Sequence, residues 1–75
     1  MKEFSEYLSI DANIRFGKPC IKGTRIAVED ILQWMASGMS NAEILNDYPS
    51  LKDEHIRSAL AFAANRESII KIIAA

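Results

Sequence analysis

Cysteine and histidine each occur only once in this chain of 75 residues. The single thiol, Cys20, excludes an internal disulfide, and Cys20 and His55 cannot complete a four-ligand zinc site or support a nucleophile–base pair that the sequence singles out. The acidic residues fall on separate predicted helices, with no pattern that demands a shared metal ion. We therefore predict no enzymatic activity, no metal and no cofactor.

Long apolar runs and an excess of one charge are also missing. No segment suits a signal peptide or a membrane span, so we expect a cytoplasmic protein without membrane contact. Nine Lys/Arg residues against ten Asp/Glu give a formal net charge of −1, whereas domains that bind nucleic acid by electrostatics alone are usually basic. Any contact with nucleic acid must therefore depend on a local patch.

The chain is short, yet 49% of it is hydrophobic. A domain of this size is near the lower limit at which one core is self-sufficient. We therefore expect a single domain over residues 1–75, with some of its apolar surface buried between chains in a homodimer or against another partner.

Residues 17–26, Gly-Lys-Pro-Cys-Ile-Lys-Gly-Thr-Arg-Ile, concentrate glycine, proline and positive charge. Three interpretations fit this basic segment: a phosphate-binding loop, a contact surface for nucleic acid, or a structural clasp that leads into the next helix. The first is disfavoured, because a Walker-type loop has its lysine directly after the second glycine, and here Thr24 follows Gly23. The alternative to a contact surface for nucleic acid is a solvated basic surface without a partner.

Helical periodicity begins after this segment. The spacing and the caps predict short strands and the Gly/Pro-rich clasp over residues 1–26, followed by helices at 28–37, 41–48 and about 53–73. Gly38 ends the first helix, Ser40 and Glu43 form a capping box for the second, and Pro49 ends it.

The third predicted helix carries two apolar stripes. Ile56, Ala59, Leu60 and Ala63 form one, and Phe62, Ile69 and Ile73 form another that is rotated from it. Two arrangements are open: both stripes pack in one small core, or the second stripe forms an interface with another subunit or a partner. For Trp34 and Tyr48 we favour packing over stacking on a nucleic-acid base.

Two helices joined by a tight break at residues 48–51, with a supporting helix before them, have the layout of a helix-turn-helix. Residues 41–48 would be the positioning helix and residues 53–64 the recognition helix. Asp53 and Glu54 weaken this interpretation, because carboxylates repel phosphates unless they accept a hydrogen bond from cytosine.

The sequence resembles the domain-of-unknown-function family 433 over about residues 7–68. The resemblance rests on Gly17-Lys18-Pro19, Lys22-Gly23-Thr24-Arg25-Ile26, residues 36–40 with Glu43-Ile44, Tyr48-Pro49 with Leu51, and residues 56–60. It implies a mainly α, three-helix, homeodomain-like helix-turn-helix with a short N-terminal β arm. Many members are considered antitoxins of type II toxin–antitoxin pairs, which implies a PIN-like nuclease toxin and promoter DNA as partners.

Two positions at the start of the third helix depart from the family, which commonly has Thr or Ser where Lys52 stands, just before the helix, and an acidic residue where His55 stands. Because Lys52 offers no acceptor, we expect Ser50 to cap this helix with Asp53, which shifts its start by two residues. The family usually has an aliphatic residue at position 20, which favours a packing role for Cys20.

We assign candidate contacts on this basis. The predicted DNA-binding residues are Lys52, His55, Arg57 and Ser58, with Lys18, Lys22 and Arg25 on phosphates. The predicted partner interface comprises Phe62, Ile69, Ile70, Ile72 and Ile73. The alternative function is a protein-interaction module that has the helix-turn-helix shape and binds no DNA.

Overall fold

The computed structural model describes residues 6–74, with side chains described for residues 6–65. A short antiparallel hairpin, β1 (Leu8–Ser9) and β2 (Cys20–Ile21), precedes three helices: α2 (Val28–Ala36), α3 (Asn41–Asp47) and α4 (Asp53–Ala74). A 3₁₀ turn, η1 (Arg15–Gly17), lies between the strands. The predicted fold class is confirmed, and each helix ends within one residue of its predicted bounds.

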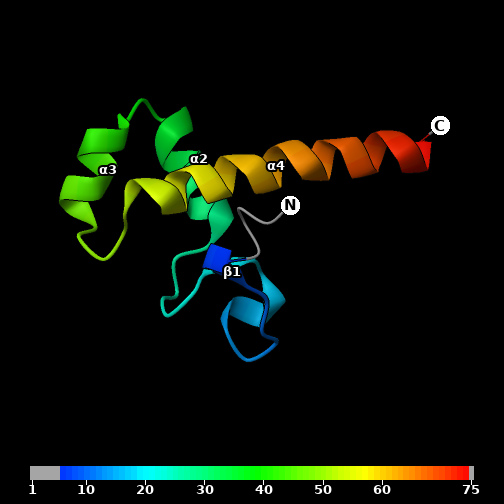
Figure 1. The fold of residues 1–75 in the computed structure, drawn as a ribbon, viewed down its shortest axis with the longest axis horizontal. Coiled ribbons are helices and arrows are strands. Elements are labelled where there is room, and N and C mark those ends of the chain that lie inside the picture. Colours follow the sequence, from blue (N-terminus) through cyan, green and yellow to red (C-terminus); the bar gives the residue numbers. More distant parts are fainter. Residues whose placement is uncertain (1–5, 75) are drawn as a thin grey trace.

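The hairpin lies below the helices, and α4 crosses α2 and α3 before its C-terminal half extends away from the body (Figure 1). Leu8 pairs with Ile21 and Ser9 with Cys20, while Cys20 also bridges to Ala27 just before α2. The Val28 amide donates to the Pro19 carbonyl at 2.9 Å. These bonds confirm the clasp interpretation, because they fix the basic segment against the start of α2.

The core lies where α4 crosses the other two helices and the hairpin. Its buried members come from all of these elements: Leu8, Ile21, Val28, Ile31, Ile44, Leu51, Ile56 and Ala59. Cys20 is 1% exposed, in keeping with its predicted packing role. Leu60, expected on the buried stripe of α4, is instead 42% exposed, because Ile56 and Ala59 occupy the inward face.

Local sequence signals determine the ends of α2 and α3. Gly38, at φ +103°, follows α2 in a Schellman arrangement, in which the Met39 amide donates to Trp34 and the Gly38 amide to Met35. Ser40 Oγ then accepts from the Glu43 amide at 3.1 Å, and Glu43 Oε1 accepts from the Ser40 amide at 2.9 Å. Both predictions, the glycine stop and the capping box, are confirmed.

Candidate nucleic-acid interface

The cations in and just before the basic segment divide into those that pair with a carboxylate and those with no carboxylate partner among the described residues. Lys18 Nζ pairs with the Glu29 carboxylate, and Arg15 Nη1 donates to Asp30 Oδ2 at 2.9 Å and to the Arg25 carbonyl at 2.7 Å. These two cations fasten the clasp to the first turn of α2. Lys18, predicted to contact phosphates, therefore already has a carboxylate partner.

The second half of the segment is a tight turn that presents two cations to solvent. The Thr24 amide and hydroxyl both donate to the Ile21 carbonyl, at 3.0 and 2.9 Å, and the hydroxyl accepts from the Ile26 amide at 3.0 Å. Gly23 has a φ of +77°, a backbone conformation that residues other than glycine rarely adopt at this position of a turn. Lys22 and Arg25 flank these two residues, and both are exposed. The Lys-Gly-Thr-Arg run thus has a structural centre and charged flanks.

The first turn of α4 is capped by a histidine. His55 Nδ1 accepts from the Lys52 amide at 2.9 Å, and the His55 amide donates to the Lys52 carbonyl at 2.9 Å. The expectation that Ser50 caps this helix is wrong: α4 begins at Asp53, so Lys52 is the cap position. The imidazole takes the place that a glutamate has in a capping box, which a search for acidic residues alone misses.

Because only half of this capping box is made, we predict that Lys52→Ser stabilises the protein. The new hydroxyl accepts an amide hydrogen bond that lysine cannot, which raises the free energy of unfolding by about 1 kcal/mol. Urea denaturation followed by circular dichroism measures this change. Lys52→Ala is the matched control, since it removes the same cation and adds no acceptor; equal stability of the two variants would contradict the prediction.

Ser58 is not available for a DNA contact. It is 1% exposed, and its hydroxyl donates to the Glu54 carbonyl at 2.8 Å within α4. The prediction that Ser58 faces a groove is therefore wrong, because α4 turns this position toward the core. The outward face of α4 is instead formed by exposed residues at helical spacing: Asp53, Arg57, Leu60 and Ala64.

Arg57 is the basic side chain that the described part of this outward face offers. Its Nε lies 3.4 Å from Asp53 Oδ2, one turn earlier, and its side chain is 69% exposed. A pair this exposed contributes little to stability and exchanges readily with other partners. Arg57 is therefore free to meet a phosphate or a base edge.

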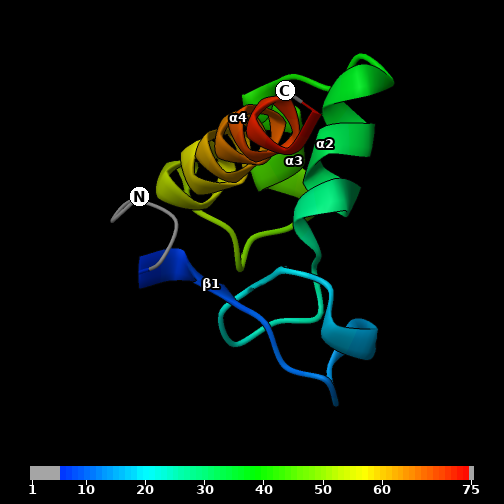
Figure 2. The same ribbon diagram turned by 90° about the vertical axis from the view of Figure 1, so that its right-hand side faces the viewer.

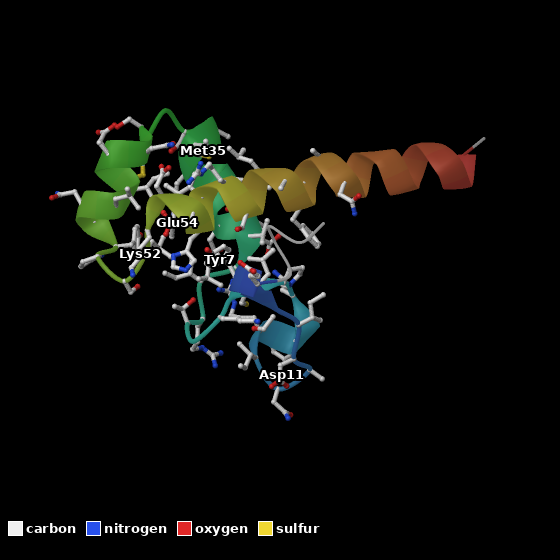
Figure 3. All side chains as sticks on the ribbon, viewed as in Figure 1. Tyr7, Asp11, Met35, Lys52 and Glu54 are labelled. Carbon is white, nitrogen blue, oxygen red and sulfur yellow. The ribbon has the colours of Figure 1, made fainter. Side chains whose placement is uncertain are left out.

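Tyr7 joins the turn of the basic segment to the start of α4. The Lys22 amide donates to the Tyr7 carbonyl at 2.9 Å, and the Tyr7 ring meets the His55 ring edge-on with centroids 5.5 Å apart. Figure 2 shows the turn at residues 22–25 beside the connection between α3 and α4, as does Figure 1. Figure 3 places Lys52 at that connection, with Tyr7 and Glu54 close by. We call residues Lys22, Arg25 and Lys52 the basic face. Arg57 lies on the outward face of α4, on the other side of the helix from His55 and Tyr7.

The predicted partner residues fall in two groups. Phe62 is half-buried, packs against the core and lines a surface groove. The side chains of Ile69, Ile70, Ile72 and Ile73 lie outside the described residues. Trp34 and Tyr48 stack on each other with centroids 4.1 Å apart and pack against the core, which confirms the packing interpretation.

Two properties of the described residues are relevant to other functions. No group of three His, Cys, Asp or Glu side chains there is placed to hold a metal ion. No described helix combines the length and the apolar character needed to cross a membrane.

Comparisons with known proteins agree on the family. Residues 8–63 match the family described as "Protein of unknown function (DUF433)". The uncharacterized protein y4eO of Sinorhizobium fredii is 36% identical over 58 residues, which cover 77% of this chain and 26% of that protein. The chain thus spans about a quarter of the length of this relative.

A solved structure is similar over nearly the whole chain. The crystal structure of a DUF433 member protein from Anabaena variabilis matches with a TM-score of 0.77 and 27% sequence identity. The match covers 99% of this chain and 74% of that one.

Proposed function

The chain belongs to the DUF433 family, and from this premise we propose that it is a dimeric antitoxin of a type II toxin–antitoxin pair. It acts in the cytoplasm, binds its own promoter DNA through α3 and α4, and binds a PIN-like nuclease toxin.

The observation that carries the proposal is the basic face. Although the net charge is −1, the turn that carries Lys22 and Arg25 lies beside the connection that carries Lys52, at the start of the helix that a helix-turn-helix inserts into the major groove. Clustered cations release counterions from the DNA backbone, so their local arrangement matters more than the overall sum.

The basic face and Arg57 have different roles in this proposal. Lys22, Arg25 and Lys52 contact phosphates and orient the protein, while Arg57, one turn into α4, reads a base edge. His55 supports this face indirectly, because it caps α4 and packs against Tyr7. Lys18 contributes less than its charge suggests, since Glu29 pairs with it.

The toxin-binding half of the proposal rests on α4. This helix continues to Ala74, and its C-terminal half extends beyond the body (Figure 1). Four isoleucines occur between residues 69 and 73 of this extension. An apolar segment that leaves the body is suited to cover a toxin surface, with Phe62 at its base.

The DNA half of the proposal is tested by titrating the purified chain against the DNA upstream of its gene at several salt concentrations. For the unaltered chain, the logarithm of the affinity falls with the logarithm of salt by a slope of about −0.9 per neutralised phosphate. A Lys22→Ala/Arg25→Ala double variant reduces that slope by about 1.8, because two phosphate contacts are lost.

Lys18→Ala is the matched control, because it removes a cation of the same segment that is already paired with Glu29. It leaves the salt slope close to that of the unaltered chain. Retention of DNA without any salt dependence would contradict the proposal. Repeating the titration with the product of the adjacent gene tests whether the toxin changes the affinity.

A protein-interaction module without DNA binding is the second candidate, and the first turn of α4 favours it. Asp53 and Glu54 lie there, and Asp53 pairs with Arg57, the one residue proposed to read a base. Under this alternative, Arg57→Ala leaves DNA retention unchanged at zero, while charged substitutions among residues 69–73 abolish the protein complex.

A further inference from the structure

Phe16 is the most exposed large hydrophobic side chain of the described residues, at 98%. It lies in η1 at φ +59°, and Arg15 before it has a φ of +51°. Residues with a β-carbon avoid this left-handed region because of steric repulsion, and a bulky residue there is unusual. Phe16 is thus unfavourable in two independent ways, through its exposure and through its backbone. Strained positions that persist are concentrated at functional sites.

The turn that presents Phe16 is held from both sides. The Arg15 guanidinium donates to Asp30 and to the Arg25 carbonyl, the Gly17 amide donates to Ile14 at 3.2 Å, and the Lys18 amide donates to Arg15 at 3.2 Å. The ring therefore projects from a fixed backbone. A preorganised aromatic side chain loses little conformational entropy on binding, which makes it an effective anchor.

A groove lies next to this turn in the sequence and in space. Its volume is about 230 Å³, and it is lined by Lys18, Pro19, Ala27, Val28, Glu29 and Phe62. Pro19, Ala27, Val28 and Phe62 make its lining largely apolar, and Lys18 and Glu29 add an ion pair. A cavity of about 150 Å³ holds a benzene molecule, so this groove has room for a phenyl ring. At 98% exposure, Phe16 does not lie in the groove of its own chain.

We infer that the occupant of the groove is Phe16 of a second copy of this chain. Phe16 and the Lys18-Pro19 wall of the groove are two to three residues apart, so each copy presents an anchor and a groove side by side. A two-fold axis between the copies lets both rings insert at once, which is the self-complementary contact of a symmetric dimer. The inference rests on the dimeric state in the proposed function and supplies its interface.

The inference is tested first by the mass of the full chain in sedimentation equilibrium, without DNA or toxin. The unaltered chain is a dimer, and Phe16→Asn raises its dissociation constant about a hundredfold or more, because both copies lose a buried aromatic anchor. Asparagine tolerates positive φ, so at concentrations where both proteins are monomeric the variant unfolds at the same or a higher temperature. A failure to fold therefore does not account for the loss of the dimer.

Ile10→Asn is the matched control, since Ile10 is 67% exposed in the same part of the chain and lines no wall of the groove. It leaves the dissociation constant unchanged. Equal loss of the dimer in both variants would overturn the inference, as would an unchanged dimer in Phe16→Asn.

A second experiment locates the ring directly. Benzoylphenylalanine at position 16 is photoactivated in a mixture with isotopically heavy chains, and mass spectrometry identifies the linked peptides. Links between light and heavy chains at residues 18–29 or at Phe62 support the inference, and links elsewhere overturn it. A monomer at all concentrations would remove both the inference and the dimer, whereas the salt titration would still decide DNA binding. A Phe16→Asn variant that stays dimeric and loses only the toxin would assign the ring to the toxin.

Discussion

The Ile56→Ala variant is expected to lose about 2–5 kcal/mol of its free energy of unfolding. A domain of this length has a total of only about 4–11 kcal/mol, so much of the variant population is unfolded at physiological temperature. Ile56 is fully buried and belongs to the core cluster to which the hairpin and all three helices contribute. Its truncation leaves a cavity that none of these elements closes alone. Urea denaturation measured by circular dichroism gives the loss.

Leu60→Ala is the matched control for this prediction. It lies one turn further along α4 and is 42% exposed, and its truncation removes a side chain of the same size. We expect a change within about 0.5 kcal/mol. Helix propensity cannot account for a loss in either variant, because alanine is the better helix former. A similar loss for both would therefore contradict the role given to the burial of Ile56.

The Asp30→Ala variant is expected to lose about 1–3 kcal/mol of the free energy of unfolding, because one carboxylate joins the clasp to α2. Asp30 Oδ2 accepts from the Ala27 amide at 3.0 Å and from Arg15 Nη1 at 2.9 Å. Ala27 has no side-chain acceptor, so Asp30 provides the capping contact at this helix start. Thermal denaturation measures the loss.

The same carboxylate makes stability depend on pH. Partial burial raises the pKa of Asp30, but the hydrogen bonds from Arg15 and Ala27 and the positive charge of Arg15 outweigh it and lower the pKa below its ordinary value. At the cap of α3, hydrogen bonds from the backbone amide and then from the side chain of Ser40 likewise lower the pKa of Glu43. At a pH between the lowered pKa values of the folded chain and the ordinary carboxyl pKa, the unfolded chain binds more protons than the folded one. These contributions are complete above the ordinary carboxyl pKa of about 4 and are lost as the pH falls through the lower folded values.

Asp30→Asn separates the charge from the capping contact, since its amide oxygen still accepts from Ala27. We expect a smaller loss at neutral pH than for Asp30→Ala and a weaker decline of stability toward acid. An acid decline identical to that of the unaltered chain would contradict the role given to Asp30.

Signals that act within a few residues are the ones that the sequence predicts well here. Ser40 with Glu43, and Gly38 after the first helix, determine helix ends through bonds between residues no more than five apart. The cap of α4 is not predicted in this way, because the acceptor is an imidazole whose ring also packs on Tyr7, almost fifty residues earlier. The burial of Ser58 is not predicted either, because a small polar residue can be buried when its hydroxyl bonds within its own helix.

Residue types and spacing by themselves therefore determine the three helices, the end of α2, the capping box of α3 and the family, since backbone hydrogen bonding and apolar periodicity are local properties. Only the tertiary structure decides which cations remain available. Lys18 and Arg15 meet carboxylates on α2, while Lys22 and Arg25 flank a turn that lies beside the start of α4. Charge pairing depends on distances between separate elements, and these are set by how the hairpin packs under the helices. The exposure of Phe16 is decided in the same way, by a left-handed turn that Arg15 holds in place from a distance along the chain.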